Sequence, residues 1–398
     1  MSPRIAPLAI TAHTVACAAG LGRAPLLQAL RARRSGLRPN DFGAQPLPCW
    51  IGRVAAVEAS PLPARFAAWD CRNNRLAWLG LQQDDFLAAA QDAIARHGSE
   101  RVALVLGTST ASIGATEEAY RRRDADGRFP AGLVDGVLHS PHSLVAFVQA
   151  LLDLRGPVCT VATACSSSAK VFAQAERLIR LGVVDAAVVG GVDSLCDSVL
   201  YGFNSLQLVS PEPCRPFDAA RRGLSLGEAA GFALLERAGP AAAPRLVGWG
   251  ESSDAHHMSS PHPEGLGARV AMQDALARAG LAPGDVDYIN LHGTATPKND
   301  EIEAQVIAAL FPPRVRASST KGWTGHTLGA AGITEAVISL LALEHGLVPG
   351  TLHCTTPDAL CGPQIALDNE VHPLRVALSN SFGFGGNNAC LAFAAGVA

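Results

Sequence analysis

Lysine is nearly absent from this chain of 398 residues. Its 32 basic residues include only three lysines, at Lys170, Lys298 and Lys321, and the remainder are arginines. Because arginine stands almost everywhere else, a position that keeps an ammonium group is a candidate for a specific role. An excess of charge of one sign is lacking as well, since 35 acidic residues leave a net charge of −3. Nucleic-acid binders need a strongly basic surface, so this balance excludes that class.

Paired cysteine motifs are also missing. The chain has ten cysteines, but it contains no C-x-x-C pair and no cysteine–histidine group at the spacing of zinc ligands. This pattern argues against a disulfide framework, a metal site and a redox protein. We therefore expect buried thiols in a reducing compartment, with no metal and no cofactor.

Uninterrupted apolar runs long enough to cross a membrane are the third absence. Asp185 and Glu335 break the best candidates. The stretch 5–20 resembles a signal peptide in composition, but Thr11, His13 and Thr14 interrupt its apolar part.

With 48% hydrophobic and 17% charged residues, the composition excludes disorder as the main description. A soluble cytoplasmic protein is expected.

Short strand-like runs alternate with helical patterns along the chain, which predicts an α/β fold built of layers. The predicted strands cover residues 102–107, 159–163, 185–190, 246–250, 288–291 and 375–378. The predicted helices cover residues 73–97, 144–154, 167–181, 268–279, 301–310 and 330–345.

The order of these elements repeats on either side of a linker at 237–244 that is rich in Ala and Pro. The first copy runs from a helix at 144–154 through a strand and a turn at 164–166 to a second helix. The second copy runs from a helix at 301–310 through a strand and a turn at 324–326 to a second helix. We infer two copies of one α/β unit, with domains at 1–240 and 241–398.

Cys165 is the candidate nucleophile, because it lies among small residues at a predicted turn from a strand to a helix. Unpaired backbone N–H groups and the positive end of the helix dipole favour a thiolate at such a turn. The same N–H groups can bind an oxyanion when the sulfur attacks a carbonyl. A cysteine chosen at random would be a small core residue, and the position at the turn is what favours catalysis.

Two histidines lie in turns rich in Gly and Thr. His292 follows the strand at 288–291, at the end where α/β sheets expose functional groups. His326 is predicted at the start of a helix, which disfavours the imidazolium and leaves a neutral ring that can donate a hydrogen bond. Together with Cys165 they form a specific set, whereas most other histidines are expected on the surface.

With these residues in place, the sequence resembles the β-ketoacyl-acyl-carrier-protein synthases, the elongating condensing enzymes of fatty-acid and type II polyketide synthesis. The resemblance covers nearly the whole chain and rests on six blocks in the family's order. They are Thr163-Ala164-Cys165-Ser166-Ser167, Arg215-Pro216-Phe217-Asp218, Gly227-Glu228-Ala229-Ala230-Gly231, His292-Gly293-Thr294, Thr320-Lys321 with Gly325-His326, and Asn380-Ser381-Phe382-Gly383-Phe384-Gly385-Gly386. The resemblance implies a thiolase-like fold, with the two α/β halves stacked as an αβαβα sandwich.

The same resemblance implies a catalytic role for each matching residue. Cys165 would carry the acyl chain as a thioester, and His292 and His326 would assist decarboxylation of a malonyl thioester. Lys321 would order the site and pair with a carboxylate, plausibly that of Glu335, while Glu303 matches an acidic position near the site. The N–H groups of Cys165 and Phe384 would form the oxyanion hole. Phe384 would also gate the entrance, on a loop that Gly383, Gly385 and Gly386 make mobile.

Other implied positions concern the acyl pocket and the partners. Thr108 and Thr110, with Ser109 and Ser112, match a stretch that lines the acyl pocket, and their polarity favours an unsaturated or oxygenated chain. An acidic acyl carrier protein would dock on basic residues, with candidates Arg72, Arg75, Arg128 and Arg215. Family members pair along a strand, here 159–163, as a homodimer or as a heterodimer with a chain-length-factor-like homologue.

Two positions depart from the family's pattern, and they put local loop structure in doubt. Arg222 stands where an Asp is usual, and Ala230 replaces a glycine.

Several alternatives are weighed against an elongating synthase. A degradative thiolase needs a second catalytic cysteine near the C-terminus. Cys390 is the nearest candidate, but its apolar strand pattern predicts a core residue, which argues against a thiolase. An initiating condensing enzyme or a chalcone-synthase relative would use Cys-His-Asn, which the Lys321 and His326 block disfavours. A non-catalytic chain-length partner would lack the nucleophile. Housekeeping fatty-acid elongation and a polyketide or aryl-polyene pathway use the same chemistry, so the pathway stays open.

Overall fold

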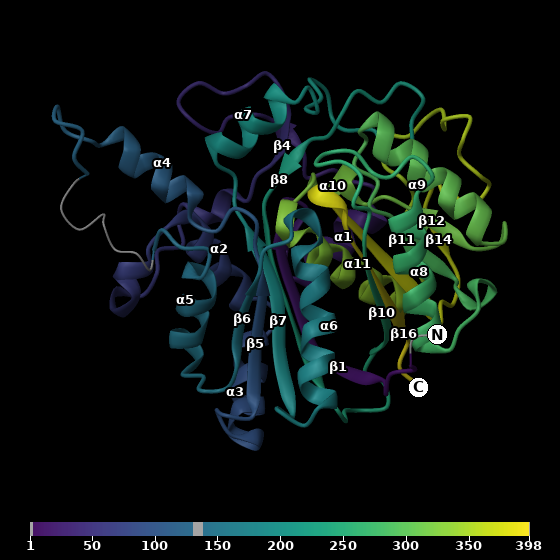
Figure 1. Cartoon of the computed structure of the whole chain (residues 1–398), viewed down its shortest axis with the longest axis horizontal. Coiled ribbons are helices and arrows are strands. Elements are labelled where there is room, and N and C mark those ends of the chain that lie inside the picture. Colours follow the sequence, from purple (N-terminus) through teal and green to yellow (C-terminus); the bar gives the residue numbers. More distant parts are fainter. Residues whose placement is uncertain (1–2, 130–137, 398) are drawn as a thin grey trace.

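The computed structural model describes residues 3–129 and 138–397. Within these residues one 11-stranded sheet is folded into two halves (Figure 1). The halves touch where β1 and β10 pair over two positions, Leu8↔Leu246 and Ala9↔Arg245. The first half consists of β1 (Leu8–Cys17), β5 (Val102–Gly107), β6 (Val158–Val161), β7 (Ala186–Asp193) and β9 (Ala229–Glu236), and β2 (Gly20–Leu21) is added at its side. The second half consists of β10 (Arg245–Ser253), β11 (Tyr288–Asn290), β12 (Arg316–Ser318), β15 (Val376–Gly383) and β16 (Asn387–Ala394).

The two halves have the same topology. Their strand orders are β6-β5-β7-β9-β1 and β12-β11-β15-β16-β10. In both, the first three strands are parallel and the last two are antiparallel additions. The pseudo-repeat inferred from the sequence is therefore present in the fold, and the linker at 237–244 joins β9 to β10.

Helices form three layers around the two sheet halves. The outer face of the first half is covered by α2 (Arg72–Leu81), α3 (Phe86–His97) and α5 (Ser143–Leu152), and that of the second by α8 (Leu266–Ala279) and α9 (Pro297–Leu310). The central layer holds α6 (Ser167–Arg180) and α11 (Ala331–His345) (Figure 1). The remaining elements are α1 (Arg23–Arg31), α4 (Ile113–Arg121), α7 (Asp197–Ser205), α10 (Lys321–Thr324), β3 (Arg38–Pro39), β4 (Trp50–Gly52), β8 (Leu226–Gly227), β13 (Leu347–Val348), β14 (Glu370–Val371) and several 3-10 turns.

The alternation of side chains along β5 explains why the sheet is covered on both faces. Val102, Leu104 and Leu106 pack in the core beneath the outer helices, whereas Ala103 and Val105 pack against the central layer. Both faces of a parallel strand are apolar when helices cover both. The αβαβα sandwich implied by the resemblance is thus confirmed.

The structure corrects one helix prediction and adds a strand, β1, that the sequence analysis did not predict. The helix predicted at 73–97 is two helices, because Asp84 and Asp85 have φ values of 54° and 56°. The Asp84 carboxylate accepts hydrogen bonds from Thr14 Oγ1 and from the backbone N–H of Arg23, which holds the break in place. The signal-like N-terminal stretch contains β1, which pairs with β9 along most of its length.

The turn of the second repeat is also displaced from its predicted place at 324–326. Ala164 opens the first turn with φ 52°, and the equivalent residue before α11 is Leu328, with φ 57°. Cys165 therefore corresponds to Gly329, and only the first repeat presents a thiol.

One helical segment, Leu328–His345, is long and apolar enough to span a membrane, but 89% of it is buried in the protein. It contains α11, whose position in the central layer accounts for its apolar character.

Candidate active site

The turn that carries Cys165 is strained and tightly held. Ala164 occupies the left-handed region, which a non-glycine residue adopts only when its surroundings enforce it. Ser167 Oγ accepts a hydrogen bond of 2.9 Å from the N–H of Thr163 and donates one of 2.6 Å to the carbonyl of Ala164. The turn fixes Cys165 at the start of α6, where its side chain is 6% exposed.

Burial raises the pKa of the Cys165 thiol to about 12, although the charge of Lys321 and the N–H of Phe384 act in the opposite direction. The sequence predicts that the helix end favours a thiolate, and this prediction is wrong for the resting protein because desolvation outweighs the helix end. The thiol is protonated at neutral pH, so the attack on a carbonyl requires a proton acceptor.

His326 supplies that acceptor. Its Nε2 lies 3.0 Å from Cys165 Sγ. Burial, and secondarily the charge of Lys321, lowers the pKa of the ring well below its usual 6.5, so the ring is neutral. His326 lies between α10 and α11 and not at the start of a long helix. The ring is therefore kept neutral by burial and not by the helix end that the sequence predicts. Among the described residues its Nδ1 has no hydrogen-bond partner, so the protein does not fix the tautomer.

His292 faces the same point from the end of β11. Its ring centre lies 5.3 Å from that of His326, with the two planes nearly perpendicular at 86°. Burial and the charge of Lys321 lower the pKa of His292 well below 6.5. Lys321 Nζ lies 3.5 Å from its Nδ1. Because an ammonium only donates, Nδ1 is the acceptor and the proton is on Nε2, which makes Nε2 a donor toward the site.

Glu303 on α9 holds the backbone of the His292 turn. Its two carboxylate oxygens accept hydrogen bonds of 2.9 Å from the N–H of His292 and 2.8 Å from that of Gly293. Asn380 Nδ2 donates a third bond of 3.2 Å. Burial raises the pKa of Glu303 to about 7, and these three hydrogen bonds oppose the rise.

Lys321 is buried and forms an ion pair with Glu335 on α11, the pairing that the resemblance implies. Its Nζ also donates to the backbone carbonyl of His292. Burial raises the pKa of Glu335 to about 7, and the ammonium opposes the rise. The ion pair thus fixes the ammonium beside both catalytic histidines.

Lys321→Met is expected to destabilise the protein by about 3–5 kcal/mol, because it leaves the carboxylate of Glu335 buried without its cation. The double variant Lys321→Met/Glu335→Gln should recover most of the melting temperature but not the activity. Thermal unfolding and a condensation assay on both variants check this. Full activity in the double variant would show that Lys321 is only structural.

Phe384 lies at the other side of the thiol. Its ring stacks on that of Phe203 from α7, with 5.5 Å between centroids and 21° between planes. Its backbone N–H lies close enough to the Cys165 sulfur to stabilise negative charge there. Gly385 and Gly386 both have positive φ, 77° and 73°, which explains why glycine is needed after Phe384. Cys165, His292, His326 and Phe384 line one cavity of about 380 Å³.

Asp193, at the end of β7, is a site residue that sequence reasoning missed. It is completely buried and accepts hydrogen bonds from the hydroxyls of Thr108, Ser109 and Thr110 and from the N–H of Gly329. It therefore ties the loop after β5 to the turn before α11. The sequence does show an acidic residue at the end of an apolar strand. Such a residue is common where a strand leads into a loop, so it does not by itself indicate a site.

Comparison with known proteins agrees with this geometry. Residues 6–241 match the family "Beta-ketoacyl synthase, N-terminal domain" and residues 244–355 match "Beta-ketoacyl synthase, C-terminal domain". The chain belongs to the β-ketoacyl synthase family. No group of three or more potential metal ligands is found in the part of the chain that the structure describes.

Three similar proteins illustrate the relationship. A mitochondrial 3-oxoacyl-[acyl-carrier-protein] synthase of Arabidopsis thaliana is 40% identical over 267 residues, which span 60% of this chain and 57% of that protein. Nodulation protein E of Rhizobium sp. (strain N33) is 38% identical over 307 residues, covering 74% of this chain and 75% of that protein. The solved structure of a ketosynthase from Xenorhabdus doucetiae in complex with its chain length factor has a TM-score of 0.88, 36% identity and 98% coverage of both chains.

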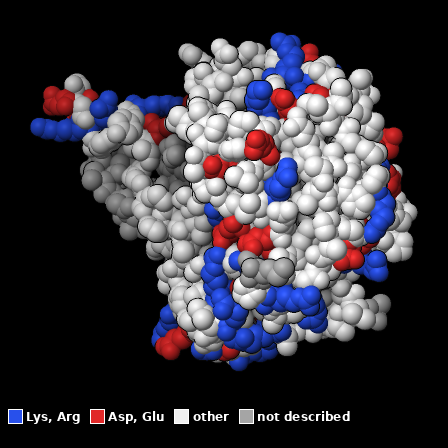
Figure 2. Space-filling model, turned by 45° about the vertical axis from the view of Figure 1, so that its right-hand side comes forward, with Lys and Arg blue, Asp and Glu red and all other residues white. Residues whose placement is uncertain are grey.

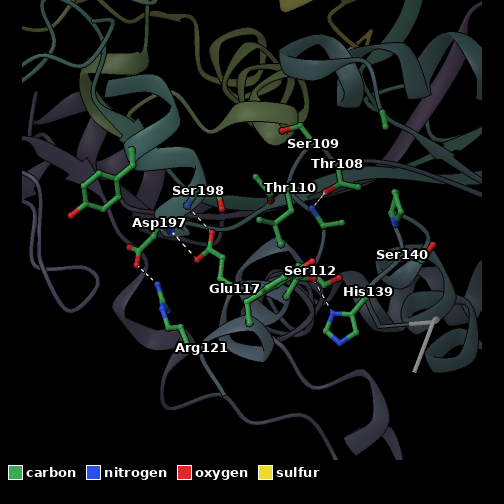
Figure 3. Close-up of a pocket in the computed structure, with 17 residues that line it drawn as sticks. Thr108, Ser109, Thr110, Ser112, Glu117, Arg121, His139, Ser140, Asp197 and Ser198 are labelled. Carbon is green, nitrogen blue, oxygen red and sulfur yellow. Dashed lines mark hydrogen bonds and ion pairs between the residues drawn. The ribbon is translucent and has the colours of Figure 1, made fainter. Parts of the chain in front are cut away.

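In this β-ketoacyl synthase the acyl-pocket candidates line a second, larger cavity of about 760 Å³ between α4, α7 and the loop after β5 (Figure 3). The hydroxyls of Thr108, Ser109 and Thr110 donate to Asp193, so their protons are not available to an acyl chain. Ser112 Oγ donates to the carbonyl of Leu138. The hydroxyl groups whose polarity favoured an oxygenated acyl chain in the sequence analysis therefore donate their hydrogen bonds within the protein.

The far wall of this cavity is charged. Glu117 accepts hydrogen bonds from the N–H groups of Asp197 and Ser198, and Arg121 pairs with Asp197 (Figure 3).

The four docking candidates of the β-ketoacyl synthase fold lie in different environments. Arg72 is not free for a partner, because its guanidinium pairs with the buried carboxylate of Glu228 and with Glu58, and 18% of its side chain is exposed. Arg75 pairs with Asp70 and Arg215 with Glu212, both near the surface, and Arg128 is exposed. Basic and acidic side chains are intermixed over most of the face in Figure 2, and basic ones gather along its lower edge. Docking on Arg75, Arg128 and Arg215 stays a prediction.

The two departures from the family's pattern have local explanations. Arg222 is exposed, so the structure tolerates an arginine in place of the usual Asp, and the ion pair of the neighbouring Arg221 with Asp358 at 2.6 Å anchors the loop. Ala230 packs against Gly80 of α2.

Proposed function

We propose that this chain catalyses decarboxylative condensation of an acyl group, held as a thioester on Cys165, with a malonyl thioester on an acyl carrier protein. The observation that carries the proposal is the 3.0 Å contact between Cys165 Sγ and His326 Nε2, beside a second neutral histidine and a buried ammonium. The Arabidopsis relative is named a 3-oxoacyl-[acyl-carrier-protein] synthase, which supports the choice of carrier.

In the loading step, Cys165 attacks the carbonyl of an acyl thioester. His326 Nε2 accepts the thiol proton and returns it to the departing sulfur of the carrier. The N–H groups of Cys165 and Phe384 bind the tetrahedral oxyanion. The products are acyl-Cys165 and the free thiol of the carrier.

In the second step, a malonyl thioester enters the emptied site. The C–C bond to its carboxylate breaks, CO2 leaves, and the electron pair forms an enolate at the thioester oxygen. The Nε2–H of His292 donates to that oxygen. His326 donates to it in the tautomer that carries the proton on Nε2, which the ring can adopt because no described residue is bonded to its Nδ1. Both rings are neutral, which makes this possible at neutral pH. The enolate carbon then attacks acyl-Cys165, a C–C bond forms, and the Cys165 sulfur leaves and regains a proton.

We propose further that the chain is the catalytic subunit of a pair whose second subunit has the same fold. The edge strand β6 pairs with β5 alone among the described strands, and Val158 on it is 39% exposed. On the same side of the molecule in Figure 1, α4 projects from the body, and Tyr120 on it is 56% exposed. The large cavity between α4 and α7 therefore lies where a second subunit would close it. The Xenorhabdus relative is complexed with a chain length factor, which supports a heterodimer.

The two kinds of pair are separated by purification followed by light scattering and an elongation assay with acyl chains of graded length and unsaturation. We expect an inactive or insoluble chain that becomes active when a chain-length-factor homologue is co-expressed. An active homodimer that extends saturated chains would instead establish housekeeping fatty-acid elongation. A stable and fully active monomer would refute both. The ten free thiols fit the reducing cytoplasm that we propose as its location.

A further inference from the structure

Lys170 is the one lysine whose role the mechanism does not explain. Lys321 belongs to the site, and Lys298 is exposed and near Glu301. Lys170 lies on α6, five residues after the nucleophile, and its side chain is partly buried. An ammonium held at that depth, in a chain that elsewhere uses arginine, indicates a specific contact.

That contact is with the loop that carries Phe384. Lys170 Nζ donates a hydrogen bond of 3.3 Å to Asn387 Oδ1. The amide nitrogen of the same side chain, Asn387 Nδ2, lies 3.5 Å from the carbonyl oxygen of Phe384 and donates to it. The cation thus orients the Asn387 amide with its oxygen toward α6 and its NH2 group toward the Phe384 peptide.

Besides the stacking of Phe384 on Phe203, two backbone hydrogen bonds connect this loop to another segment. The N–H of Gly385 donates to the carbonyl of Met258 at 2.7 Å, and the N–H of Asp254 donates to the carbonyl of Gly386 at 2.9 Å. These hydrogen bonds join the loop to the segment 254–262. Lys170 provides the connection to α6, the helix that begins next to Cys165. Two of the loop's glycines have positive φ, so its position depends on these few contacts.

We propose that Lys170 is a positioning residue that holds the Phe384 loop in its closed position through Asn387. The proposal rests on the proposed function, in which the N–H of Phe384 belongs to the oxyanion hole, and on the gating role that the family resemblance implies for Phe384. Opening the loop breaks the contact between Lys170 and Asn387. The contact therefore slows entry of long acyl chains and keeps the oxyanion donor in place during condensation. Burial lowers the pKa of the Lys170 ammonium. The negative charge of Glu251 opposes this shift, and the positive charge of Arg177 adds to it.

The test compares loading of a long and a short acyl group onto Cys165 from acyl carrier protein, followed by intact-protein mass spectrometry. Lys170→Met should raise the ratio of long-chain to short-chain loading rates by about tenfold, the size expected for one charge-assisted hydrogen bond. It should also lower kcat for condensation with little change in KM for the malonyl substrate. Lys170→Arg should restore both values toward those of the unmodified protein.

A double-mutant cycle connects the effect to the loop. Asn387→Ala should shift the same ratio, and Lys170→Met/Asn387→Ala should be no worse than the larger single effect, because both remove one connection. Arg180→Met removes a cation from the last turn of the same helix, where Arg180 pairs with Glu176, and should leave the ratio unchanged. If Lys170→Met does not fold, Lys170→Gln and Asn387→Ala test the same ratio.

Additive effects, or equal changes in long-chain and short-chain loading, would overturn the proposal. Absence of any acyl group on Cys165 in the unmodified protein would overturn the proposed function instead.

Discussion

Cys165→Ala is expected to lower the condensation rate by a factor on the order of 10⁴ or more, because no other group in the cavity can carry the acyl chain. The other cysteines do not replace it. Burial raises the pKa of Cys214, the cysteine whose sulfur lies near the carbonyl of Lys321, to about 11, and no histidine nitrogen is hydrogen-bonded to that sulfur in the described structure. The variant should fold normally, since Ala is small and Cys165 lies in a turn already held by Ser167.

The measurement is acyl loading from acyl carrier protein, with intact-protein mass spectrometry and peptide mapping. Cys390→Ala is the matched control, because Cys390 is fully buried in β16 and should leave loading unchanged. Acyl label on a cysteine other than Cys165 would contradict the assignment.

His292→Ala and His326→Ala are each expected to lower the rate of CO2 release from malonyl-carrier protein by about 10²–10³-fold. The reason is that one oxyanion-type donor is worth about 2.7–4 kcal/mol in the transition state. The two variants should differ in loading. His326→Ala removes the acceptor at 3.0 Å from the thiol and should slow acyl transfer, whereas His292→Ala should load Cys165 at nearly the normal rate.

A pH profile provides a second readout for the histidines. Because the pKa of both rings lies well below 6.5, protonation of the rings should not lower the rate of CO2 release as the pH drops through 6.5. A fall near pH 7 is expected only from Glu303 or Glu335, whose pKa values burial raises to about 7. The control variant is His97→Gln, because His97 lies at the end of α3 and does not line the catalytic cavity. This variant should release CO2 at the normal rate. Unchanged CO2 release in either catalytic variant would refute the role of that histidine.

The sequence predicts the layers and the repeat of this fold because the apolar strands that helices cover on both faces leave a clear pattern. Residues 102–107 and 186–193 are such strands, and nearly all their side chains are buried. The break between α2 and α3 was not predictable from periodicity, since it depends on what the Asp84 carboxylate binds from α1 and β1. β1 was missed as a strand because a central strand and an apolar leader have similar compositions, so the composition of 5–20 did not identify it as a strand.

The catalytic residues were predictable because each lies in a short motif of small residues at a turn. The neutral state of His326 was predicted as well, although its cause is burial and not a helix end, but the protonation state of Cys165 was not. A local rule, the helix end, predicts a thiolate at Cys165, whereas the folded environment raises its pKa by desolvation. Asp193 and Asn387 escaped notice because Asp193 is 85 positions from its partner Thr108 and Asn387 is 217 positions from its partner Lys170. Arg72 was misjudged as a docking residue because its partner Glu228 is 156 positions distant.

Single turnover of acyl-loaded enzyme tests the central claim most directly. Enzyme carrying a labelled acyl group on Cys165, alone and with a co-expressed partner subunit, is mixed with malonyl-carrier protein, and CO2 and carrier-bound products are measured together. We predict one CO2 for each acyl group lost from Cys165, and a labelled β-ketoacyl product two carbons longer on the carrier. Release of the label as free acid without CO2, or CO2 without a longer product, would contradict the account.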